Sequence, residues 1–147
     1  MRILVISDSH RNDLSTINFQ RYDVVIHCGD YGQSQDILLK HHVLFVKGNC
    51  DTYGKEKQSL TVFNKKILVI HGNHEQVKFG YQRLVYRALE EQAEICFFGH
   101  THEQTCFVES GILFLNPGNY PQSYIEIEDQ NIVFYKNGKM LIQDYKW

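Results

Sequence analysis

Short apolar runs alternate with segments of helical character through the first third of the chain. These runs, which are rich in Ile, Leu and Val, occupy residues 2–7, 23–27 and 43–46. Continuous apolar runs of this kind predict strands that are buried on both faces. Helices are expected at residues 13–21, where Asn12 and Asp13 offer a cap, and at residues 34–40. The alternation predicts a parallel sheet that is covered on both sides.

The remainder of the chain changes to a pattern dominated by strands. A polar surface loop is expected at residues 52–57, and apolar runs at 60–63 and 67–70 flank a turn at 64–66. Apolar positions at helical spacing predict a helix over residues 81–91. The later apolar runs, mostly separated by turn signals such as Asn-Gly, occupy residues 95–98, 105–109, 112–115, 123–127 and 132–135. Two packed sheets follow from this arrangement.

Length and composition fit one soluble α/β domain that spans residues 1–147, with 43% hydrophobic and 22% charged residues. The net charge of −2 argues against wholesale electrostatic binding to nucleic acid or to a membrane surface. No apolar run approaches the roughly 20 residues of a membrane span. The four cysteines form no CxxC pair, and the first strand begins without a signal-peptide layout. We therefore expect a reducing, cytoplasmic location.

Five of the apolar runs end in residues that can bind a metal ion. Ligands in open α/β sheets bind beyond the carboxyl ends of the strands, so these side chains are expected to meet at one edge. The mixture of carboxylate, imidazole and amide groups suits Mn, Fe or Zn better than Ca or Mg alone. Seven ligands exceed the needs of one first-row ion but fit two ions that share a carboxylate. The seven residues are Asp8, His10, Asp30, Asn49, His71, His100 and His102.

Each of these residues also has an ordinary structural explanation when it is taken alone. His10 fits a surface loop, Asp30 a helix cap, Asn49 a turn and His71 a buried core. Their joint occurrence after five strands favours the metal site. His100 and His102 are two residues apart, so in an extended segment both imidazoles point the same way.

Several short motifs, in this order, resemble those of the calcineurin-like metallophosphoesterases. The chain is most similar to their small prokaryotic branch, the YfcE-like phosphodiesterases, over residues 3 to about 135. The resemblance implies a four-layer α/β/β/α sandwich, with two packed mixed sheets flanked by helices and a dinuclear metal site. The motifs are Asp8-Ser9-His10, Gly29-Asp30, Gly48-Asn49-Cys50-Asp51, His71-Gly72, Gly99-His100-Thr101-His102 and Asn116-Pro117-Gly118.

The resemblance also implies a division of the ligands between two ions. One ion takes Asp8, His10 and His102, the other takes Asn49, His71 and His100, and Asp30 bridges them. A hydroxide between two divalent metals would attack phosphorus in line. Mn²⁺ is the expected metal, with Fe, Zn, Ni or Mg as alternatives. The residues expected to act in catalysis are Asp30, Asn49, Asp51 and His71.

The role of Asp51 has two possible explanations, and three departures from the family pattern bear on the substrate preference. Asp51 is expected either to orient a ligand histidine or to be an exposed turn carboxylate. Many larger relatives have a histidine where this chain has Cys50. The cysteine argues against activity on monoesters with poor leaving groups. Asn73 replaces the second histidine of His-Gly-His, with His74 one residue later. Asn119 replaces the serine of the Asn-Pro-Gly-Ser turn.

The sequence therefore predicts a metal-dependent phosphodiesterase that acts on a small phosphodiester or nucleotide-like substrate. A nuclease, a phosphomonoesterase, or a weakly active metal-binding scaffold for protein association are the alternatives, because the retromer subunit of this fold serves as a scaffold. No extended nucleic-acid footprint and no membrane partner are expected. The sequence allows a homodimer but does not identify an interface for one. His27 is expected to be buried structure, and residues 145–147 to pack on the domain or at a subunit contact.

Overall fold

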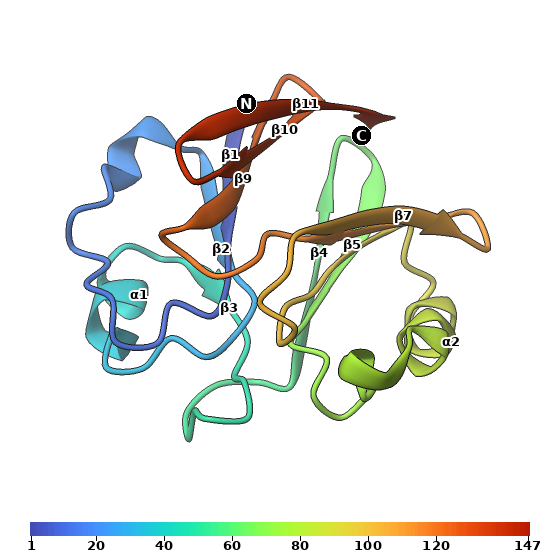
Figure 1. Cartoon of the computed structure of the whole chain (residues 1–147), viewed down its shortest axis with the longest axis horizontal. Helices are drawn as coiled ribbons and strands as arrows, with labels where there is room; N and C mark the ends of the chain where they lie inside the picture. Colours follow the sequence, from blue (N-terminus) through green and yellow to red (C-terminus); the bar gives the residue numbers. More distant parts are fainter.

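Two β-sheets pack face to face in the computed structural model, and one helix covers the outside of each sheet (Figure 1). The structure describes the backbone of residues 1–147 and all side chains except those of residues 142–145. The first sheet has the order β11-β10-β9-β1-β2-β3, and the second has the order β4-β5-β6-β8-β7. The strands are β1 (Arg2–Ile6), β2 (Val24–His27), β3 (Leu44–Phe45), β4 (Lys57–Val62), β5 (Lys65–Ile70), β6 (Ile95–Phe97), β7 (Thr105–Glu109), β8 (Ile112–Asn116), β9 (Ser123–Glu128), β10 (Asn131–Lys136) and β11 (Lys139–Lys146).

Short helical segments connect the strands on the outer faces. The α-helices are α1 (Gln35–Lys40) and α2 (Gln82–Glu90), and the 3₁₀ turns are η1 (Phe19–Arg21) and η2 (Val77–Phe79). Strand β1 is parallel to β2 and β2 to β3, while β5, β6 and β8 are parallel in the other sheet. The remaining pairings are antiparallel. Both sheets are therefore mixed, as expected.

The buried side chains form three layers. Strand β1 shows how one strand contributes to two of them: Ile3 and Val5 face the other sheet, while Leu4 and Ile6 pack toward α1. Strand β5 divides in the same way, so that Val69 lies between the sheets and another set of side chains packs under α2. Burial on both faces explains why these strands read as continuous apolar runs. The predicted α/β/β/α sandwich is confirmed.

The helix expected at residues 13–21 is wrong in its extent, because only η1 is helical there. The Asp13 carboxylate accepts hydrogen bonds from the backbone N–H and the hydroxyl of Ser15, at 2.9 Å and 2.8 Å. This local turn competes with helix formation, as short polar side chains commonly do. Leu14 is nevertheless buried in the layer beneath α1.

The hairpin between β4 and β5 is also displaced from its expected position. Strand β4 begins at Lys57, within the predicted loop, and the two-residue turn is formed by Phe63 and Asn64 rather than by residues 64–66. Both turn residues have positive φ, at 50° and 60°. Two positive φ angles are the mark of the tight turn that matches the twist of paired strands. Asn64, which tolerates positive φ, explains why the sequence predicts a turn in this region.

The last residue, Trp147, packs on the domain as one of the two alternatives expected, whereas the side chain of Tyr145 lies outside the described residues. Strand β11 was not anticipated from the sequence, and it pairs antiparallel with β10. Beyond it the Trp147 side chain is buried between the sheets, and its indole N–H donates to the carbonyl of Val62 at 3.1 Å. Among the described residues, no helix is long and apolar enough to cross a bilayer.

Candidate metal centre

The carboxyl ends of β1, β2, β5 and β6 meet where the two sheets face each other. Backbone hydrogen bonds join neighbouring strand ends: the N–H of Asp8 donates to Gly29, and the N–H of Gly99 donates to His71, at 2.9 Å and 3.0 Å. A third bond crosses between the sheets, because the N–H of His100 donates to Oδ2 of Asp8 at 3.0 Å. These contacts position the loops that carry six of the seven candidate ligands, and the seventh, Asn49, follows β3.

Five of the seven candidate ligands have a positive φ angle. Left-handed backbone is uncommon for residues other than glycine, and each instance costs on the order of 1–3 kcal/mol. The expectation that His100 and His102 lie in an extended segment and point the same way is therefore wrong, because β6 ends at Phe97 and both histidines are left-handed. The φ angles are 50° for Asp8, 46° for His10, 59° for Asp30, 72° for His100 and 64° for His102.

One group of donor atoms comprises Asp8, His10 and His102. Nε2 of His10 lies 3.2 Å from Nε2 of His102, and Oδ1 of Asp8 lies 3.3 Å from the latter atom. Two nitrogen ligands that each lie about 2.1 Å from one ion are roughly 3.0–3.4 Å apart. The spacing of the two histidines therefore matches that of ligands on a shared ion.

A second group comprises Asn49, His71 and His100. Oδ1 of Asn49 lies 3.1 Å from Nε2 of His71 and 3.1 Å from Nδ1 of His100. The two histidine nitrogens are 3.2 Å apart. His100 and His102 thus face two different groups, the first through Nδ1 and the second through Nε2.

Asp30 lies between the two groups. Its Oδ2 is 3.3 Å from Nε2 of His71, and its Oδ1 accepts from the backbone N–H of Cys50 at 2.9 Å. Asp30 can share an ion with His71 and His100, and it also forms a cluster with His10 and Cys50 whose ligand atoms lie within 4.8 Å of one another. Sequence reasoning did not count the Cys50 sulfur among the ligand atoms.

Burial and hydrogen bonds set the protonation of the central histidine. Nδ1 of His71 donates to the carbonyl of Cys28 at 2.7 Å, which directs Nε2 at the centre. Burial alone lowers the pKa of His71, but the hydrogen bond to Asp30 and the charges of Asp8 and Asp30 raise it overall. Burial likewise raises the pKa of Asp30, yet the bond and charge of His71 outweigh it and bring that pKa to about 2.

For His100 and Asp8, burial outweighs the other influences on the pKa. Burial, followed by repulsion from His71, lowers the pKa of His100 to about 4 and so favours the neutral imidazole that a metal ion requires. Burial raises the pKa of Asp8, against the attraction of His71 and the hydrogen bond from Ser7. The environment therefore disfavours a bare carboxylate at Asp8.

A divalent cation fits the residues present. Oδ1 of Asp8 is buried without a hydrogen-bond partner, and the atoms around it are histidine nitrogens: Nε2 of His102, His71 and His10 lie 3.3, 3.9 and 4.0 Å away. A buried carboxylate oxygen without a donor is costly, and a metal ion removes that cost. The orphaned oxygen and the mixed oxygen and nitrogen donors suit a transition-metal ion.

A family model supports the same interpretation. The model for the calcineurin-like phosphoesterase superfamily domain matches residues 1–135 of the chain. The chain belongs to this superfamily. Membership supports metal-dependent hydrolysis of phosphoesters and confirms the resemblance carried by the short motifs.

Individual proteins and solved structures are similar to this chain over most of its length. A probable metallophosphoesterase of Bacillus subtilis, YsnB, is 38% identical over 130 residues, which cover 81% of this chain and 75% of that protein. The crystal structure of a Streptococcus pneumoniae protein, described as a predicted phosphoesterase, superposes with a TM-score of 0.78 at 30% identity, covering 97% of each chain. Vps29 of Entamoeba histolytica, solved with Zn²⁺, has a TM-score of 0.74 at 24% identity over 97% of each chain, which shows a shared fold.

Asp51 differs from both roles expected for it in this metallophosphoesterase. Its half-buried carboxylate accepts from the backbone N–H groups of Asp30 and Gly48, each at 2.7 Å, and of Tyr31 at 3.2 Å. Among its described contacts there is no ligand histidine. Asp51 instead holds the loops that present Asp30 and Asn49.

Two further residues have positioning roles that the sequence analysis did not assign. Buried Asn116 donates to the carbonyl of Gly99 at 3.2 Å and to the hydroxyl of Thr101 at 2.9 Å, and so holds the loop with His100 and His102. In the sequence it stands out only as the first residue of the Asn116-Pro117-Gly118 turn motif, which assigns it no role. His27, as expected, is buried in the fold: Nδ1 accepts from Gly29 at 3.0 Å.

The residues that depart from the family pattern surround the centre, and one of them, Cys50, belongs to a described ligand cluster. The imidazole of His74 is exposed and pairs with Glu56 at 3.0 Å, and it belongs to none of the described ligand clusters. The amide of Asn119 contacts Gln122 at 3.4 Å. Cys50 and Asn49 are exposed, whereas Asp8, Asp30 and His71 form the buried floor of the site.

Proposed function

We propose that the chain is a phosphodiesterase that uses two divalent metal ions. The observation that carries this proposal is the convergence of seven donor side chains in overlapping groups, with Asp30 between them. Four of these residues follow strands of the first sheet, and three follow strands of the second. The mixed oxygen and nitrogen donors favour Mn²⁺, with Fe or Zn as alternatives.

The side chains divide into a buried floor and an exposed rim. Two bound ions would lower the pKa of a water molecule and stabilise the attacking and leaving oxygens of an in-line displacement. Oδ1 of Asn49 faces the histidines, and its Nδ2 points toward Sγ of Cys50 at 3.5 Å. A thiol is a weak acceptor, so Nδ2 can donate instead to a phosphate oxygen that enters from solvent. The carbonyl of Cys28 fixes the ring of His71, and Asp51 fixes the backbone of Asp30.

The preference for a diester follows from the group that stands at Cys50. Nearby carboxylates and burial raise the pKa of its thiol, with burial the larger cause. A thiol is a weak hydrogen-bond donor compared with an imidazolium. A monoester with a poor leaving group needs stronger help at its leaving oxygen than this side chain provides. A singly charged diester with a good leaving group is the better match.

The experiment measures hydrolysis of bis-p-nitrophenyl phosphate and p-nitrophenyl phosphate by metal-stripped protein before and after Mn²⁺ is added. We expect metal-dependent turnover that favours the diester, and two bound ions per chain by elemental analysis. Asp30→Ala should lower kcat by at least a hundredfold. Glu109→Ala, at the far end of β7, is the matched control that removes an exposed carboxylate.

Two results would contradict the proposal in different ways. Hydrolysis with a single bound ion would overturn the two-metal site, and faster hydrolysis of the monoester would overturn the diester preference. Tight metal binding without hydrolysis of either ester would favour the scaffold alternative, in which the fold serves protein association.

A further inference from the structure

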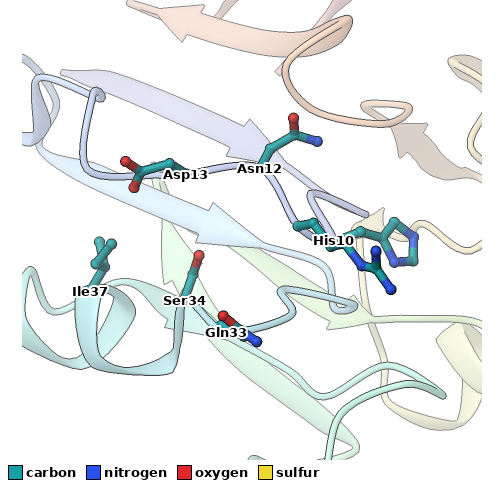
Figure 2. A pocket seen from close by; sticks show the side chains of 7 residues that line it. His10, Asn12, Asp13, Gln33, Ser34 and Ile37 are labelled. Carbon is teal, nitrogen blue, oxygen red and sulfur yellow. The ribbon is translucent and has the colours of Figure 1, made fainter.

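A pocket of about 530 Å³ adjoins the candidate metal centre on the side of the first sheet. It lies between the loop after β1 and the segment that leads into α1. Figure 2 shows Asn12 and Asp13 across from Ser34 and Ile37, with His10 at one end. Because His10 both lines the pocket and faces His102, a substrate held at the centre can extend into this space. The pocket is lined by His10, Arg11, Asn12, Asp13, Gln33, Ser34 and Ile37.

Several polar groups around this pocket have no partner among the described contacts. The exposed Arg11 guanidinium forms no described ion pair, and the Gln33 amide forms no described hydrogen bond. Ser34 is 6% exposed, and its hydroxyl does not cap α1. The pocket therefore offers one free cation together with uncharged donors and acceptors.

The neighbouring polar side chains are already held in place. Nδ2 of Asn12 donates to the carbonyls of Ser9 and Tyr120, at 2.9 Å and 3.3 Å, which leaves Oδ1 as an acceptor. The carboxylate of Asp13 is engaged by Ser15. These hydrogen bonds leave the negative charge of Asp13 in place, so the pocket has one carboxylate, the guanidinium of Arg11 and an apolar patch from Ile37.

We propose that this pocket binds the nucleoside substituent of a nucleotide phosphodiester; the inference rests on the proposed function and names the substrate class of the same site. Uncharged donors and acceptors suit the hydroxyl groups and base edges of a nucleoside, and a guanidinium plane can stack on a base. The volume falls in the range of roughly 300–1,000 Å³ that is typical of small-molecule sites. A simple alkyl substituent would leave most of it empty.

The charge of the surface limits the substrate to a nucleotide or short oligomer. The chain has a formal net charge of −2, and among the described lining residues Arg11 is the only Lys or Arg and stands opposite one carboxylate, that of Asp13. Polynucleotide binding depends on neutralising many phosphates with Lys and Arg. The pocket therefore fits one nucleoside beside the reacting phosphate.

A second pocket of about 510 Å³ supplies a control. It is lined by Leu39, Phe45, Tyr53 and Gln58, among others, and by none of the seven candidate ligands. Gln58 and Gln33 therefore carry the same amide in two pockets of similar size, one remote from the centre and one adjoining it. Substitution of each by alanine gives a matched pair.

The test compares kcat/KM for thymidine 5′-(p-nitrophenyl phosphate) with that for methyl p-nitrophenyl phosphate in the Mn²⁺-loaded protein. Both esters release p-nitrophenol, so their ratio reports on the nucleoside alone. We expect a ratio above 10, which Gln33→Ala lowers about threefold to tenfold, as the loss of one hydrogen bond implies. Arg11→Ala should lower it at least as much, and Gln58→Ala should leave it unchanged.

A binding measurement separates this inference from the proposed function. In NMR titrations of the metal-free protein with thymidine 5′-monophosphate, we expect the side-chain amide signals of Gln33 to shift and those of Gln58 to stay in place. A ratio near one, or equal effects of the two glutamine substitutions, would overturn the nucleoside pocket. If neither ester is hydrolysed but the Gln33 signals shift, the proposed hydrolase fails while the pocket stands.

Discussion

Nε2 of His10 lies 3.2 Å from Nε2 of His102, although the two residues are 92 positions apart in the chain. Each histidine follows a strand of a different sheet, and Oδ1 of Asp8 lies near both. This contact defines one half of the candidate metal centre. The other half, around His71 and His100, can be perturbed separately.

Removal of His102 should empty one half of the centre. For His102→Ala we expect the metal content to fall from two ions to one per chain and kcat to fall at least a hundredfold, because Asp8, His10 and the shared Asp30 hold an ion more weakly without this imidazole. Elemental analysis after dialysis and steady-state kinetics measure both. His74→Ala is the control, since that exposed histidine pairs with Glu56. An unchanged metal content in His102→Ala would contradict the assignment.

A side chain at Gly99 should displace the ligands. A Cβ atom there would lie 2.1 Å from Oγ of Ser7 and 2.7 Å from Oδ2 of Asp8. We expect Gly99→Ala to weaken metal binding at least tenfold in calorimetric titrations. Ser7→Ala removes the nearest atom, so the double variant should recover part of the affinity. Wild-type affinity in Gly99→Ala would show that the loop has room to move.

Asn116 should act by positioning the loop that carries His100 and His102. Asn116→Asp removes both donors to Gly99 and Thr101, so we expect a loss of roughly 1–3 kcal/mol in the free energy of unfolding and a tenfold or larger fall in metal affinity. Denaturant unfolding and metal titration measure the two effects.

The control for Asn116 lies in the same loop. Asn119→Asp introduces the same charge at a residue whose amide contacts only Gln122 among its described hydrogen bonds. A stability loss in Asn116→Asp without a loss of metal affinity would leave Asn116 with a purely structural role.

His27 should make stability depend on pH in mildly acidic solution. Burial lowers its pKa from 6.5 to about 3. Between these values the unfolded chain binds the extra proton, so stability is full above pH 6.5 and falls with decreasing pH, by up to about 1.4 kcal/mol per pH unit. Unfolding by urea at pH 7 and pH 5, in the metal-free protein, measures this change.

His27→Gln is the informative variant because glutamine can keep both kinds of hydrogen bond. The native imidazole accepts from Gly29 at 3.0 Å and so donates to Oγ of Ser9 at 2.8 Å. We expect the variant to lose less stability than the wild-type protein between pH 7 and pH 5. An identical loss in both proteins would assign the pH dependence to other groups.

The positions of the strand ends could be predicted from the sequence, because each apolar run stops at a polar residue that can bind a metal ion. Asp8, Asp30 and His71 each follow an apolar run closely, and parallel strands bring such residues to one edge. The division of His100 and His102 between two groups could not be derived from their spacing, because left-handed backbone at both residues replaces strand alternation. Only the family resemblance anticipated it.

Positioning residues are harder to recognise for a different physical reason. His27 lies in an apolar strand, and Asn116 ends another, so both resemble ordinary structural residues. Their roles depend on hydrogen bonds to loops that are distant in sequence. Strand β11 and Trp147 are hard to predict for the same reason, because their partners, β10 and Val62, are determined by how the sheets pack.

Because the ligands come from both sheets, a bound metal ion would link the two sheets mechanically. All four cysteines are free thiols, so no disulfide joins the sheets. An ion held by Asp8 and His102 would act as a removable cross-link between the two halves of the sandwich. Loading with metal should then slow the separation of the sheets, so that the lifetime of the folded protein would follow the supply of metal in its surroundings.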